Sequence, residues 1–149
     1  MVCARAHEPD RHPPDTVIVT ASNAPAANQL LVYSPSGALL ESLPTLGQGG
    51  VSGNAGGVAA ARDRVAVVNF GSSNVSVFVR DGDGSSFRLE SLVPTQGNPV
   101  SVAFGEQHLY VLTTTRVESH PMSERGVHAH GVPRQIPGSD TALASRLDQ

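Results

Sequence analysis

The chain has 149 residues, enough for one domain of ordinary size, and a formal net charge of −3. All ten basic residues are arginine. The absence of lysine excludes P-loop phosphate binding, Schiff-base chemistry and Ser–Lys catalysis. The charge balance also argues against a nucleic-acid partner. Glycine (15) and proline (11) are frequent, and valine (19) far outnumbers isoleucine (2), which is typical of a β-rich protein with many turns.

Residues 1–15 contain charges, two histidines and three prolines, but no apolar run. We expect this stretch to be disordered and to be neither a signal peptide nor a membrane segment. A chain that begins here would be cytoplasmic, whereas an export signal lost upstream would make the protein periplasmic or secreted. The single cysteine, Cys3, excludes an intrachain disulfide.

Short apolar runs then follow one another, separated by turns rich in Gly, Asn, Asp and Pro. Each run has four to seven residues, is rich in valine, and in several cases alternates apolar with polar side chains, which predicts β-strands. The runs are residues 16–21, 29–33, 38–43, 57–61, 64–69, 74–80, 87–93, 100–104, 108–113 and a weaker one at 116–119.

The runs also repeat along the chain. Val17-Ile18-Val19, Val65-Ala66-Val67 and Leu109-Tyr110-Val111 lie 48 and 44 residues apart. A period of 40–50 residues that holds four short strands is typical of a β-propeller blade.

This period divides the chain into units at 16–43, 57–93 and 100–119. The middle unit has four strands. The first lacks its innermost strand, and the third lacks its fourth strand and has a short third strand. The predicted fold is therefore all-β, with about two and a half antiparallel four-stranded propeller blades in an incomplete ring.

The predicted core lies on the apolar positions of these strands. It consists of Val17, Val19, Leu31, Val65, Val67, Val75, Val77, Phe78, Val102, Phe104, Leu109 and Val111.

Three stretches of residues 16–122 carry a resemblance to a known family. They are the hairpin at 69–78 (NFGSSNVSVF), the glycine-rich loop at 53–57 (GNAGG) and residues 97–104 (GNPVSVAF). The chain resembles bacterial lactonase-type propellers with YVTN-like repeats, which include 6-phosphogluconolactonases and carboxymuconate cyclase-like proteins. The resemblance implies a seven-bladed ring and lactone hydrolysis. Because the chain encodes fewer blades, we expect a truncated or frameshifted piece of a longer propeller.

Residues 123–149 hold two prolines and no run of strand-forming residues, so we expect a mostly disordered tail in which Pro133 blocks any further strand.

Arg116, Glu118 and His120 alternate along the predicted strand at 116–119 and just beyond it, so their side chains share one face. An arginine that binds a carboxylate or phosphate, with Glu and His for proton transfer, would suit lactone chemistry or a cyclising lyase. The alternative, which we favour, is an ion pair at the outer edge of a strand that is ending.

His128 and His130 form an H-x-H pair, which in a strand would direct both imidazoles to one face, as a divalent metal requires. The alternative, which we favour, is that both histidines are solvated in the tail and bind no metal. We expect no cofactor of any other kind.

These observations leave three hypotheses. The chain is a fragment of a lactonase-like hydrolase that acts on a small sugar or organic-acid lactone, a non-catalytic propeller module that binds a partner, or an inactive truncated product. Beyond a lactone substrate, the expected partners are further copies of the chain, joined through unpaired blade edges, and we expect neither nucleic acid nor a membrane.

Overall fold

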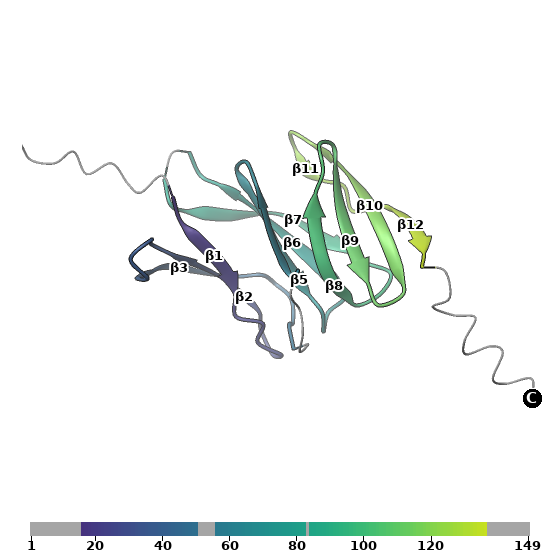
Figure 1. Ribbon diagram of the computed structural model, residues 1–149, viewed down its shortest axis with the longest axis horizontal. Helices are drawn as coiled ribbons and strands as arrows, with labels where there is room; N and C mark the ends of the chain where they lie inside the picture. Colours follow the sequence, from purple (N-terminus) through teal and green to yellow (C-terminus); the bar gives the residue numbers. More distant parts are fainter. Residues whose placement is uncertain (1–15, 51–55, 83, 137–149) are drawn as a thin grey trace, which may run out of the picture.

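The computed structural model describes residues 16–50, 56–82 and 84–136, which form antiparallel β-sheets and contain no helix (Figure 1). None of these residues therefore belongs to a helix that could span a membrane. The strands are β1 (Ile18–Ala21), β2 (Gln29–Tyr33), β3 (Leu39–Pro44), β4 (Val58–Ala61), β5 (Arg64–Asn69), β6 (Asn74–Arg80), β7 (Phe87–Pro94), β8 (Pro99–Phe104), β9 (His108–Thr113), β10 (Arg116–Ser123), β11 (Gly126–Val127) and β12 (Val132–Gln135). The predicted all-β class is confirmed.

Three sheets follow one another along the chain. The first has the order β1-β2-β3 and the second β4-β5-β6-β7. In the third, β8, β9 and β10 are neighbours in that order, and β10 also pairs with β11 and β12. Each of the predicted apolar runs holds a strand, because valines two residues apart lie on the same face of a pleated sheet and form an apolar row that can be buried.

The third sheet has a fourth strand, which corrects the prediction that this strand is missing and that Pro133 blocks it. β12 pairs with β10 over Arg116–Ser119, and Pro133 lies opposite Glu118. β12 pairs with β10 alone, and an edge strand tolerates a residue without a backbone N–H group. The predicted tail is therefore folded up to residue 136. Residues 137–149 and 1–15 lie outside the described residues.

One backbone hydrogen bond recurs in all three sheets and shows that β12 is the equivalent of β3 and β7. In each sheet the residue that follows the last strand donates its N–H to the carbonyl oxygen of a residue just before β2, β6 or β10. The three bonds are Thr45 to Asn28 (3.1 Å), Thr95 to Ser73 (2.9 Å) and Ile136 to Thr115 (3.1 Å).

The second sheet is buried on both faces, because it lies between the other two (Figure 1). Its first face packs on Leu30 and Val32 of β2, and the residues of that face are Val65, Val67, Phe78 and Phe87. Its second face packs on Val102, Leu109 and Val111 of the third sheet, and those residues are Ala66, Val68, Val75, Val77 and Val93. This double burial is the main apolar contribution to stability.

Eight of the twelve predicted core residues are buried: Val65, Val67, Val75, Val77, Phe78, Val102, Leu109 and Val111. Val17, Val19 and Phe104 are half-buried and pack against the same clusters. Leu31 is wrongly assigned to the core, because its neighbours Leu30 and Val32 occupy the inward face of β2.

The outward faces of the first and third sheets expose large apolar side chains. Leu112 and Val117 on the third sheet are 38% and 41% exposed. Their counterparts in the second sheet, Val68 and Val75, are buried, with exposed fractions of 1% and 0%. Association of the chain with further copies through unpaired blade edges stays a prediction.

A buried polar network joins the first two sheets at the end of their strands. Asn69 accepts hydrogen bonds at Oδ1 from Thr45 Oγ1 (2.8 Å) and Asn28 Nδ2 (3.0 Å). It donates from Nδ2 to Ser76 Oγ (2.8 Å) and Asn74 Oδ1 (2.7 Å). Asn28, Thr45, Asn69 and Ser76 are fully or almost fully buried, so each side chain depends on the others to satisfy its polar atoms.

We expect Asn69→Ala to lower the free energy of unfolding by about 3 kcal/mol, because Asn28 Nδ2, Thr45 Oγ1 and Ser76 Oγ each lose one of their buried hydrogen bonds at once. Urea unfolding followed by circular dichroism measures this loss. Gln29→Ala, an exposed polar truncation on β2, is the control and should change stability by less than ~0.5 kcal/mol. A loss below about 1 kcal/mol for Asn69→Ala would show that the network is not required.

Candidate functional site

Glu118 and His120 meet on the inward face of β10. Alternation along the strand directs both side chains toward the second sheet, while Val117 faces outward. Glu118 is 2% exposed and His120 is 1% exposed. The distance from His120 Nε2 to Glu118 Oε2 is 3.2 Å. The predicted common face is therefore present, but it is buried and not at the outer edge of the strand.

Every polar end of this pair has a partner. The backbone N–H of Gln96, in the loop between β7 and β8, donates to Glu118 Oε1 (2.8 Å). His120 Nδ1 lies 3.2 Å from the carbonyl oxygen of His128. Both ring nitrogens of His120 thus face oxygen acceptors, whereas a neutral imidazole has one N–H group. The tautomer of the ring determines which of the two nitrogens donates.

Arg116 does not join the other two predicted catalytic residues. Among the described residues, no hydrogen bond or ion pair links Arg116 to Glu118 or His120. The buried Nε atom of Arg116 also has no hydrogen-bond partner among them. Its backbone is fixed instead, because Arg116 N donates to Thr113 Oγ1 (2.9 Å). The trio expected from the sequence is reduced to a pair.

Residues 128–131 cover the pair and leave a small cavity beside it. The cavity has a volume of about 200 Å³, and Glu118, His120 and His130 lie in its lining. Gly131 approaches the His120 ring so closely that a Cβ atom there would lie 2.7 Å from Nδ1. Pockets for small-molecule ligands typically have volumes of about 300–1,000 Å³, so this cavity is below that range.

The candidate metal ligands, His128 and His130, lie between β11 and β12 and not within one strand. Both residues are exposed, and His128 contributes to the site through its carbonyl oxygen. Over the described ranges, no three His, Cys, Asp or Glu side chains are grouped so as to hold a metal ion.

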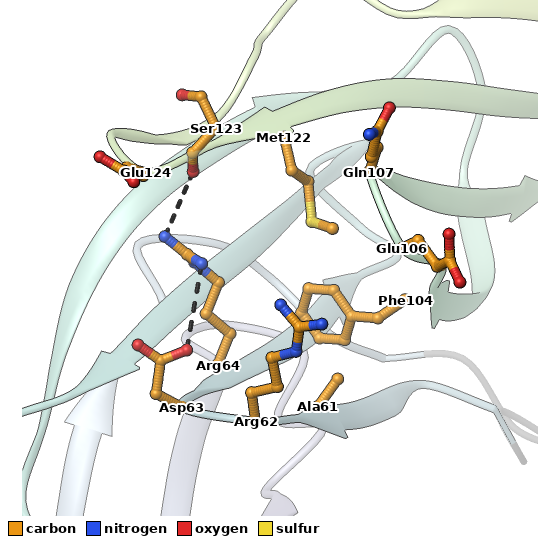
Figure 2. Close-up of a pocket in the computed structure, with 11 residues that line it drawn as sticks. Ala61, Arg62, Asp63, Arg64, Phe104, Glu106, Gln107, Met122, Ser123 and Glu124 are labelled. Carbon is orange, nitrogen blue, oxygen red and sulfur yellow. Dashed lines mark hydrogen bonds and ion pairs between the residues drawn. The ribbon is translucent and has the colours of Figure 1, made fainter.

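A larger cleft, of about 470 Å³, lies at the opposite end of the second and third sheets (Figure 2). Three hairpin connections surround it: Ala61–Arg64 between β4 and β5, Phe104–Gln107 between β8 and β9, and Met122–Glu124 at the end of β10. None of these residues is recognisable as part of a site from the sequence, because they come together only when adjacent sheets stack.

The two arginines of this cleft differ in their charge partners. Arg64 donates from Nε (2.7 Å) and Nη2 (2.8 Å) to the two carboxylate oxygens of Glu90. The hydrogen bond to Glu90 raises the pKa of the Arg64 guanidinium above its ordinary value, although partial burial acts in the opposite direction. Arg62 is exposed and makes no side-chain hydrogen bond or ion pair with any described residue. Figure 2 shows its side chain extending into the cleft that Phe104 also lines.

A second repeat, which the sequence analysis missed, explains the position of Glu118. Pro-Thr-x-Gly occurs at residues 44–47 and 94–97, and each copy begins at the last residue of a strand, β3 or β7. Ser76 of β6 donates to the carbonyl oxygen of Thr45 in the first copy, and Glu118 of β10 accepts from Gln96 in the second. Ser76 and Glu118 thus hold equivalent loops to the next sheet, and aligning the two motifs would have revealed this structural role.

Comparison with protein-family models, with curated proteins and with solved structures finds no match for this chain.

We expect Glu118→Leu to lower the free energy of unfolding by about 3 kcal/mol, because Gln96 N–H and His120 Nε2 lose a buried acceptor. Glu118→Gln keeps an oxygen at this position and should cost about 1 kcal/mol. Urea unfolding of both variants measures the difference. Equal losses would contradict the assigned hydrogen bonds.

Proposed function

We propose that this chain is part of a lactonase-type propeller and serves as a binding module, with the cleft of Figure 2 as its ligand site. The observation that carries this proposal is the separation of roles between the two ends of the sheets. The predicted acid–base pair, Glu118 and His120, is buried and fully partnered, while an open cleft lies among the hairpin turns at the other end.

The state of Glu118 and His120 argues against hydrolysis. A general base must lie within hydrogen-bond reach of the water that it activates. Both oxygens of Glu118 have protein partners, and both nitrogens of His120 face protein oxygens. No arginine contacts the pair, so the residue proposed to polarise a lactone carbonyl is lacking among the described neighbours.

The cleft has the features of a small-molecule site. Its volume of about 470 Å³ lies within the usual range for ligand pockets. Phe104 and Met122 supply apolar surface and pack on the buried cluster between the second and third sheets. Turns carried by stacked sheets are a common place for binding residues, because the sheets hold the turns in fixed positions.

Lactone hydrolysis is the second candidate function, and one observation favours it. Glu118, His120 and His130 line the same small cavity, so three groups capable of proton transfer lie near one space.

Hydrolysis of glucono-δ-lactone, followed by acid release at constant pH, separates the two functions. We expect the chain to leave the buffer rate unchanged, because the acid–base pair is sealed by its own hydrogen bonds. His130→Ala provides a variant that spares the buried pair. A rate above that of buffer that falls in both Glu118→Gln and His130→Ala, with their circular dichroism unchanged, would establish the hydrolase instead.

A further inference from the structure

We propose that the cleft of Figure 2 takes a small ligand with a single carboxylate and an apolar body, and that Arg62 binds the carboxylate. This inference rests on the proposed function, which makes the cleft a binding site, and adds the chemical class of the ligand.

Of the two arginines that line the cleft, Arg62 is the one without an acidic partner among the described residues. Arg64 is committed to Glu90 through two hydrogen bonds, and its Nη1 lies 4.0 Å from Asp63 Oδ1. The Arg62 side chain has neither kind of contact with the described residues, and Figure 2 shows it extending into the cleft. A planar guanidinium with free N–H groups is suited to bind a carboxylate through two parallel hydrogen bonds.

The backbone at Arg62 gives an independent reason to assign it a role. Arg62 is the first of two residues that connect β4 to β5, and its φ angle is +56°. Gly, Asn and Asp are favoured in such turns, because the left-handed region is unfavourable for other L-residues. No hydrogen bond or ion pair of the Arg62 side chain with a described residue offsets this cost, and unfavourable backbone conformations of this kind cluster at functional sites.

The floor and the rim of the cleft define the rest of the ligand. Phe104 and Met122 face its centre, which favours an apolar group next to the carboxylate (Figure 2). Glu106 and Glu124 lie at the rim with their carboxylates turned away from the centre. These two negative charges would oppose a dianion such as a phosphate monoester more strongly than a monoanion.

Titration of the isotopically labelled chain with four aromatic probes, followed by ¹H–¹⁵N NMR, tests the charge class. The probes are benzoate, benzamide, benzylamine and phenyl phosphate, which share one ring and differ in charge. We expect benzoate to shift the amide signals of residues 61–64, 104–107 and 122–124 with a millimolar Kd, as its small size allows. The other three probes should bind at least fivefold more weakly.

Arg62→Gly separates a binding role from a structural one, because it removes the cation and also permits the positive φ angle. We expect the variant to lose benzoate binding at least fivefold while its thermal midpoint stays the same or rises. Arg88→Gln, which removes an exposed arginine paired with Asp81 outside the cleft, should bind benzoate normally.

The outcomes distinguish this inference from the proposed function. Cleft signals that respond equally to benzamide, or more strongly to benzylamine or phenyl phosphate, would overturn the carboxylate assignment and leave the binding site in place. Unchanged benzoate binding in Arg62→Gly would also overturn it. The absence of any response at the cleft would overturn the inference and the proposed function together.

Discussion

Both faces of the β4–β7 sheet are buried, and the positions of all the candidate residues depend on this packing. Leu30 and Val32 cover one face, and Val102, Leu109 and Val111 cover the other. Stacking the third sheet on the second buries the inward side of β10, which carries Glu118 and His120. The same stacking brings together three hairpin turns and so forms the cleft around Arg62.

Polar side chains recur at one level of the stack and fix the spacing between consecutive sheets. Asn69 and Ser76 bind Thr45 between the first and second sheets. Glu118 binds the equivalent loop between the second and third sheets, through Gln96. Because a buried polar atom without a partner is costly, each of these side chains stabilises only the stacked arrangement. Glu118 and His120 therefore have a structural role between the sheets, and the binding role that we propose lies at the opposite end of the sheets.

The strands were largely predictable from the sequence, because a two-residue alternation of valine with polar residues has few other structural solutions. β12 was not, since Val132–Gln135 has no apolar run and is held as a strand by pairing with β10. Leu31 shows a related limit: alternation identifies two faces of a strand but does not determine which face the next sheet will cover.

The candidate site was predictable only where it depended on local spacing. Residues two apart in a strand share a face, and Glu118 and His120 accordingly meet. Their burial depends on residues 128–131, which the sequence analysis assigned to a tail. The cleft could not be found from the sequence, because Arg62, Phe104 and Met122 come from three turns that only sheet stacking brings together.

The central claim is that Glu118 and His120 are closed to solvent and serve to join sheets. Long-range ¹H–¹⁵N NMR of the His120 ring tests it most directly, because hydrogen-bonded and buried ring protons exchange slowly with water. The account predicts a slowly exchanging N–H proton on the ring. Added glucono-δ-lactone should leave the chemical shifts of the ring signals unchanged. Ring protons that exchange as fast as those of a free imidazole, with signals that move on addition of the lactone, would contradict it.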